Sequence, residues 1–268
     1  MPSFGYDGFR IAFEQRGRRK GAAERPIVLI HGLLLPRTHN YPLADALADR
    51  GNRVILIDLL GHGESDQPNH SRHHTMELYG RQVVALLDHL DIPEAVIGGT
   101  SLGANVTLEV AVHNPDRTRA MFIEMPVLER ATPAAAAIFL PLTIAYAQAA
   151  MPLRMVAAFM RRVPRGISIY WDVVFDTLSR DPGPSAAVLH GLLTGRIGPH
   201  PTDREKLETP ALIIGHPRDI LHPFSDAEAL HRELRNSELV RANSFLELRF
   251  PPNRLSDRIA DFLDEVWA

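Results

Sequence analysis

The 268-residue sequence contains no cysteine. This absence excludes disulfide bonds, thiol catalysis and zinc sites built on cysteine ligands. Lysine is nearly absent as well, since only Lys20 and Lys206 occur among the 29 basic residues. The other 27 (29 − 2) are arginines spread along the chain, and the net charge is −3. The charge of the chain therefore gives no electrostatic reason to expect a nucleic-acid partner.

The sequence also lacks the features of a targeting or spanning segment. Residues 1–5 have neither the basic start nor the apolar run of a signal peptide, so a cytoplasmic location is expected. Residues 133–153 are largely apolar and lie between Arg130 and Arg154, and their length would permit a spanning helix. Prolines are expected to break such a helix, and they stand at Pro133, Pro141 and Pro152. We therefore expect no stable membrane insertion.

Apolar runs and helical patterns alternate along most of the chain. After an opening hairpin around Asp7, the runs typical of buried strands are 27–30, 53–58, 95–98, 120–124, 211–214 and 238–241. The helical patterns are 42–50, 75–90, 102–113, 226–234 and 255–266. This alternation predicts the α/β class, with a mostly parallel central sheet and helices on both faces.

Residues 128–200 interrupt the alternation. They lack strand-like runs and are rich in alanine, methionine and leucine. The simplest interpretation is a helical lid inserted into a single core domain made of residues 1–127 and 201–268. Its apolar, methionine-rich composition suggests a small apolar substrate or ligand, because methionine adapts to irregular shapes.

Residues 99–103 read Gly-Thr-Ser-Leu-Gly and stand between a strand-like run and a helical pattern. This context is the geometry of a nucleophile elbow, in which a serine occupies a strained turn and its flanking glycines avoid clashes with nearby backbone. Ser101 would lie at the amino end of a helix, where unpaired N–H groups favour an anion.

The chain resembles the α/β-hydrolase family over nearly its whole length. The resemblance rests on residues 31–32, 58–66, 99–103 and 215–219, in order after successive strands. It implies that Ser101 is the nucleophile, that the backbone N–H groups of Leu33 and Leu102 form the oxyanion hole, and that Asp219 is the acid. Glu124 is an alternative acid, because some relatives place theirs at the end of the strand after the elbow helix.

The histidine base of this family belongs in the loop between the last strand and the last helix. Here the corresponding position is Ser244 or Phe245, and no histidine occurs after His231. One hypothesis is that His222, or alternatively His216, substitutes, since both flank Asp219. A second is that the protein binds an apolar ligand without turnover, or uses the oxyanion hole alone. A third is an inactivating substitution, although the loop also lacks the usual glycine, which favours natural divergence.

We expect a hydrolase that acts on an apolar ester, thioester or lactone through Ser101, with a ligand-binding homologue as the alternative. No cofactor or metal is predicted. His70, His73 and His74 share a polar segment, but no carboxylate or cysteine nearby completes a ligand set, and a solvated loop is expected there. His31 is interpreted as an organiser of the oxyanion loop.

Overall fold

The computed structural model describes residues 2–17, 24–164, 166, 169–217, 219–244, 247–250 and 252–268. Its central sheet has eight strands in the order β1-β2-β4-β3-β5-β6-β7-β8. Pairs β1/β2 and β2/β4 are antiparallel, whereas all neighbours from β4 to β8 are parallel. The strands are β1 (Ser3–Tyr6), β2 (Phe9–Arg16), β3 (Pro26–Ile30), β4 (Arg53–Ile57), β5 (Ala95–Thr100), β6 (Thr118–Glu124), β7 (Ala211–Gly215) and β8 (Ser237–Arg241). The prediction of a mostly parallel α/β sheet is confirmed.

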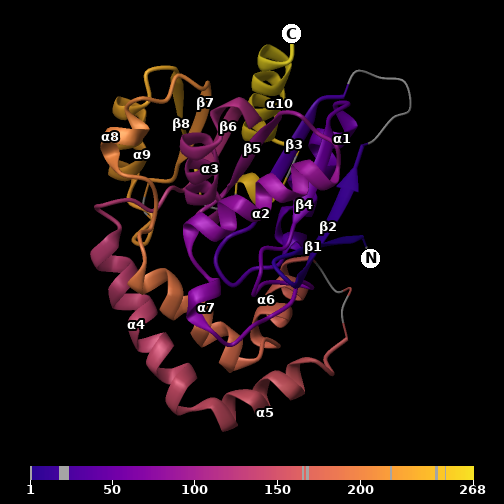
Figure 1. Cartoon of the computed structure of the whole chain (residues 1–268), viewed down its shortest axis with the longest axis vertical. Helices are drawn as coiled ribbons and strands as arrows, with labels where there is room; N and C mark the ends of the chain where they lie inside the picture. The colour runs from indigo at the N-terminus through magenta and orange to yellow at the C-terminus, as the bar shows by residue number, and fades with distance from the viewer. Residues whose placement is uncertain are drawn as a thin grey trace.

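Helices cover both faces of this sheet (Figure 1). Those outside the region 128–200 are α1 (Tyr41–Asp49), α2 (Met76–His89), α3 (Leu102–His113), α8 (Pro201–Arg204), α9 (Phe224–Glu233) and α10 (Arg254–Val266). Short 3₁₀ helices are η1 (Arg37–Asn40), η2 (Ser71–His73), η3 (Pro115–Arg117) and η4 (Glu247–Arg249).

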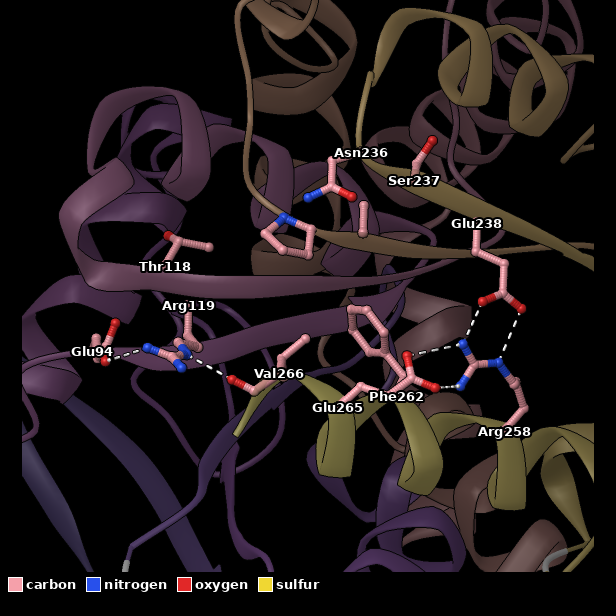
Figure 2. A pocket seen from close by; sticks show the side chains of 12 residues that line it. Glu94, Thr118, Arg119, Asn236, Ser237, Glu238, Arg258, Phe262, Glu265 and Val266 are labelled. Carbon is pink, nitrogen blue, oxygen red and sulfur yellow. Dashed lines mark hydrogen bonds and ion pairs between the residues drawn. The ribbon is translucent and has the colours of Figure 1, made fainter. Parts of the chain in front are cut away.

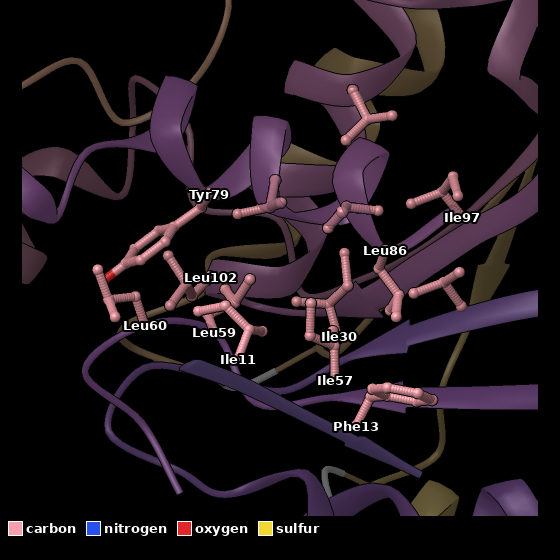
Figure 3. Close-up of a cluster of buried hydrophobic side chains, with 14 of the residues drawn as sticks. Ile11, Phe13, Ile30, Ile57, Leu59, Leu60, Tyr79, Leu86, Ile97 and Leu102 are labelled. Carbon is pink, nitrogen blue, oxygen red and sulfur yellow. The ribbon is translucent and has the colours of Figure 1, made fainter. Parts of the chain in front are cut away.

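The residues of β3 show how one strand supports two cores. Val28 and Ile30 belong to the cluster that packs under α2 and α3, part of which Figure 3 shows. Ile27 and Leu29 belong to the cluster under α1 and α10. Successive side chains of a strand point to opposite faces, so a continuous apolar run is needed where both faces are covered. The uninterrupted apolar sequence of β3 therefore places it in the middle of the sheet.

The described part of residues 128–200, between β6 and α8, folds into helices that lie on one side of the carboxyl edge of the sheet (Figure 1). They are α4 (Thr132–Gln148), α5 (Ala150–Met160), α6 (Ile169–Leu178) and α7 (Pro182–Thr194). The described part of 128–200 contains no strand.

The expectation that the prolines of this region would break a helix was wrong for Pro141. Pro141 lies inside α4, and Pro133 and Pro152 lie in the first turns of α4 and α5. In the first turn of a helix the backbone N–H groups have no partner within the helix, so a proline is tolerated there. Within α4, Pro141 cannot donate to the carbonyl of Ala137, but Ala137 is exposed. The helix ends instead at Gln148. Among the described helices none is by itself long and apolar enough to cross a membrane, and one pair that passes by length and composition is bent by 93°.

Candidate active site

Ser101 stands in the turn between β5 and α3 with φ 56° and ψ −110°. A positive φ is a strained conformation for a serine, and here it points the hydroxyl away from the strand–helix junction. The glycines on either side are sterically required, because a Cβ at Gly99 or Gly103 would approach the carbonyl oxygen of Ile30 to 2.5 and 2.3 Å. The backbone N–H of Ser101 donates to the carbonyl of Glu124 at 2.9 Å, which ties the turn to β6.

His222 lies beside this hydroxyl. Its Nε2 is 2.9 Å from Ser101 Oγ, and its Nδ1 is 2.8 Å from Asp219 Oδ2. With Asp219 ionised, Nδ1 carries the proton and donates to the carboxylate, so Nε2 presents its lone pair to the serine hydroxyl. The structure therefore joins three residues that the sequence singled out into one hydrogen-bonded chain of hydroxyl, imidazole and carboxylate.

The acid and the imidazole come from a single short loop between β7 and α9. Asp219 Oδ1 accepts the backbone N–H groups of Leu221 at 2.9 Å and His222 at 3.0 Å. Burial alone raises the pKa of Asp219, but the hydrogen bonds and positive charge of His222 outweigh it and lower the pKa to about 2. The loop ends at Pro223, the N-cap of α9. The carboxylate of Asp219 thus orients the imidazole through one oxygen and stabilises the loop backbone through the other.

Leu33 and Leu102, the predicted oxyanion donors, line the same pocket as Ser101. Leu102 is the first residue of α3, so its N–H has no partner within the helix. His31 is fully buried beneath the Leu33 loop, with Nδ1 2.8 Å from Gly32 O and Nε2 accepting the N–H of Leu59 at 3.1 Å. Burial lowers the pKa of His31, which keeps it in the neutral form that these two bonds require. His31 therefore holds the loop against the end of β4.

The pocket beside Ser101 is almost entirely apolar. Asn105 is its other polar residue, and this amide is occupied: Nδ2 donates to Val127 O at 2.6 Å and to Ile197 O, while Oδ1 accepts the Val127 N–H at 3.1 Å. Asn105 thereby fastens α3 to both ends of the helical region, a role that the sequence analysis missed. The complete lining is Leu33, Met76, Ser101, Leu102, Asn105, Val127, Ala135, Phe139, Leu189, Leu192, Leu193, Ile197 and Leu221.

Glu124, the alternative acid, lies in a separate and fully buried cluster. Arg249 Nη2 contacts its two carboxylate oxygens at 2.5 and 2.6 Å, and Thr100 Oγ1 donates to it. His216, the alternative base, places Nε2 3.2 Å from Glu124 Oε1. Burial by itself raises the pKa of Glu124, but Arg249 and then His216 and Thr100 outweigh it and hold the pKa below its ordinary value. The structure therefore assigns His222 to Ser101 and His216 to Glu124.

Arg249 was not foreseen from the sequence. It belongs to η4, in the loop where the family carries its histidine, and its side chain is 8% exposed. The one available signal was its position between Leu248 and Phe250, since an arginine flanked by apolar residues is often drawn into the core with a partner. Of the two positions expected for the family histidine, Ser244 is exposed and Phe245 lies outside the described residues, as does Arg218.

The expected solvated loop at 70–74 was wrong for His74. Its ring is fully buried, with Nδ1 3.1 Å from Tyr79 Oη and Nε2 3.1 Å from Pro68 O, because α7 packs over this segment. Among the described residues, no group of three histidine, aspartate or glutamate side chains is arranged to hold a metal ion.

A larger pocket lies at the other end of the strands, beside α10 and the amino ends of β6, β7 and β8 (Figure 2). Its charges are already paired: Arg258 with Glu238 and Glu265, and Arg119 with Glu94. In parallel sheets ligands bind at the carboxyl ends of the strands. We therefore place the functional site at Ser101.

Comparison with known proteins agrees with this architecture. The model of the alpha/beta hydrolase fold family matches residues 25–160, which is half of the chain, and the chain belongs to this family. A putative non-heme haloperoxidase of Mycobacterium phage D29 is 35% identical over 114 residues, covering 42% of this chain and 38% of its own length. The uncharacterized hydrolase YugF of Bacillus subtilis (strain 168) is 24% identical over 97% of this chain and 96% of its own.

Solved structures share the fold along the whole chain. The enol-lactonase from Burkholderia xenovorans LB400 has a TM-score of 0.75 at 19% identity and covers 99% of each chain. A thermophilic esterase from Thermogutta terrifontis has a TM-score of 0.74 at 23% identity, over 99% of this chain and 97% of its own. The matched segment spans only 38% of the length of the haloperoxidase.

Proposed function

We propose that this protein is a serine hydrolase of small apolar esters, thioesters or lactones. The observation that carries the proposal is the hydrogen-bonded chain from Ser101 through His222 to Asp219 beside an apolar pocket. The lactonase and esterase named above share this fold, and their names denote hydrolytic reactions, which supports the proposal. The alternative of binding without turnover rested on a missing base, and an imidazole next to the hydroxyl removes that reason.

In the proposed reaction, Ser101 Oγ attacks the substrate carbonyl carbon while its proton passes to His222 Nε2. The negative charge that develops on the carbonyl oxygen is received by the N–H groups of Leu33 and Leu102. The carbon–oxygen bond to the leaving group then breaks, and His222 returns the proton to the departing alcohol. Water, deprotonated by the same imidazole, then attacks the acyl carbon. The bond from that carbon to Ser101 Oγ breaks, the acid leaves, and His222 returns the proton to Oγ. Asp219 stays ionised throughout and stabilises the imidazolium.

The apolar pocket sets the proposed substrate class. Among the described residues that line it, the polar side chains are the proposed nucleophile and an amide whose hydrogen bonds are already made. A charged acyl group would lose its water there without gaining a partner, which is costly. We assign the helices of 128–200 the role of a lid, because Ala135 and Phe139 of α4 and Leu189 of α7 cover Ser101.

The proposal is tested by labelling with a fluorophosphonate probe and by hydrolysis of p-nitrophenyl esters. We expect labelling that Ser101→Ala abolishes, and turnover of acetyl and butyryl esters with a much slower reaction of the matched hemisuccinate, whose acyl group is charged. Equal labelling of the Ser101→Ala variant, or no labelling at all, would contradict a Ser101 nucleophile. Preference for the hemisuccinate would contradict the apolar substrate class alone.

A further inference from the structure

The exposed apolar side chains of this protein are concentrated on the helices between β6 and β7. Twelve large apolar side chains are exposed among the described residues, and ten of them belong to α4, α5 and α6. The most exposed in α5 are Met151 at 71%, Met155 at 69% and Phe159 at 61%. Scattered exposed apolar residues are normal on a protein surface, but a concentration of this kind marks a contact surface.

Helix α4 is apolar on both of its sides. Its inner side carries Ala135 and Phe139 toward the Ser101 pocket, and its outer side exposes Leu140 and Ile144. None of its 17 residues is charged. A surface helix ordinarily turns a polar face to water, and one that is apolar all round is buried in protein or in lipid. The outer face of α4 therefore lacks the partner that its composition requires.

We define the α4–α5 face by Leu140, Ile144, Met151, Met155 and Phe159. The two helices meet at Ala149 and form the outer margin of the molecule at the end away from the C-terminus (Figure 1). Contacts of α4 and α5 with α7, and of α5 with α6, occupy their inner sides. The five side chains of this face are therefore left exposed by the described helices.

The helices around this face carry a net positive charge, because residues 131–181 contain five arginines and three aspartates. Residues 131–171 contain Arg154, Arg161, Arg162 and Arg165 and no aspartate or glutamate, whereas the whole chain has a net charge of −3. The remainder of the chain therefore has a net charge of −7 (−3 − 4). Arg154 lies 3.6 Å from the carboxylate of Asp181, and Arg161 donates to the backbone carbonyl of Ser179. For Arg161 and Arg162, no ion pair with a carboxylate is found among the described contacts. Arg165 lies outside the described residues.

We propose that the α4–α5 face is a contact surface for an anionic lipid membrane. Apolar side chains would enter the boundary between headgroups and acyl chains, and the arginines would meet the anionic headgroups. The rest of the molecule is negatively charged and is repelled by an anionic membrane, so this face is the one that can approach the membrane. A two-fold contact with a second copy is disfavoured, because it would bring arginines against arginines across the symmetry axis. The proposed contact is peripheral and does not depend on the reaction at Ser101.

The test is sedimentation of the full chain with vesicles. We expect binding to vesicles of phosphatidylglycerol mixed with phosphatidylcholine, little binding to phosphatidylcholine alone, and release by salt. Phe159→Ser should abolish most of the binding, whereas the matched control Phe250→Ser, which alters a phenylalanine 58% exposed on the core, should leave it unchanged. Arg162→Gln should weaken binding by about 5-fold, and Arg235→Gln on the exposed core surface should have no comparable effect.

Three results would overturn the proposal: no binding to anionic vesicles, equal binding to both kinds of vesicle, or a dimer in analytical ultracentrifugation that Phe159→Ser dissociates. The last would assign the face to a second copy. Because sedimentation is also carried out with Ser101→Ala, a failed membrane contact and a failed hydrolase assignment give different patterns of results.

Discussion

Asp219 and Glu124 lie at the carboxyl ends of the neighbouring strands β7 and β6, but one is partly exposed and the other is buried. Asp219 follows β7 in a partly exposed loop and bonds to His222, three residues away. Glu124 ends β6 in the buried interior and bonds to Arg249, 125 residues away. One carboxylate therefore faces an imidazole that can gain and lose a proton, and the other faces a guanidinium that is permanently charged.

This difference shows how a serine, a histidine and an acid can meet although the family position holds no histidine. The imidazole comes from the loop of its own acid, so Asp219 and His222 are positioned by local geometry. The loop that holds the histidine in the family instead supplies Arg249, which neutralises the second acid. We infer that Glu124 supports the elbow, through Thr100 and the Ser101 backbone, and that Asp219 supports the reaction.

The largest expected effect is that of removing one imidazole but not the other. His222→Ala should lower kcat/KM on the order of 10⁶-fold, because the serine loses its proton acceptor. His216→Ala is the matched control and should change kcat/KM by less than about tenfold, since that ring contacts Glu124. Steady-state hydrolysis of a p-nitrophenyl ester measures both. Similar losses in the two variants would remove the distinction between the clusters.

Asp219→Asn should lower kcat on the order of 10⁴-fold while KM changes little. The amide can donate to His222 Nδ1 and so favours the tautomer in which Nε2 carries the proton and cannot accept one. Glu124→Gln is the comparison, and we expect a much smaller change in kcat because Glu124 does not contact the imidazole of His222. A larger kcat loss for Glu124→Gln would make Glu124 the functional acid.

Arg249→Met should lower the free energy of unfolding by about 3–5 kcal/mol, because it leaves the Glu124 charge buried without its partner. Urea denaturation measures this change. The double variant Glu124→Gln/Arg249→Met removes both charges and should recover most of the loss. If the double variant is as unstable as Arg249→Met alone, the arginine acts by packing rather than by charge.

The free energy of unfolding should fall as the pH falls below about 6.5. Burial lowers the pKa of four histidines, which are His31, His39, His62 and His74. Below their ordinary value of 6.5 the unfolded chain binds protons that the folded chain refuses, so each contributes a slope of up to about 1.4 kcal/mol per pH unit.

The two carboxylates act at lower pH. Their folded-state pKa values are depressed, so their stabilisation is present above the ordinary values of 3.8 for Asp219 and 4.5 for Glu124, and is lost as the pH falls below these. Denaturation at pH values from 4.5 to 7 thus separates the histidines from these two carboxylates, while Glu109, whose pKa is raised by burial, contributes in the opposite direction. His62→Phe should flatten the slope, because the ring is buried and its Nε2 has no hydrogen-bond partner. An unchanged slope would show that His62 is not the source.

Much of the fold could be predicted from the sequence because its signals are local. The apolar run of β5, the glycines around Ser101 and the pattern of α3 each depend on neighbours within a few residues, and α3 begins and ends where predicted, at Leu102 and His113. One error came from packing between distant segments, and the other from a local exposure that the pattern does not report. His74 is buried by α7, and Pro141 continues a helix whose lost hydrogen bond falls on the exposed side.

Residue patterns along the chain were enough to predict the α/β sheet, the strained serine turn and two histidines near Asp219 as candidate bases. The choice between these histidines required the folded arrangement of the loops. Residues 216 and 222 both lie near Asp219 along the chain, but the loop turns His222 toward Ser101 and His216 toward Glu124. The partner of Glu124 likewise depended on the fold, because the arginine is 125 residues distant. Periodicity reports which face of an element is buried, whereas the distance between two side chains depends on how separate loops meet in space.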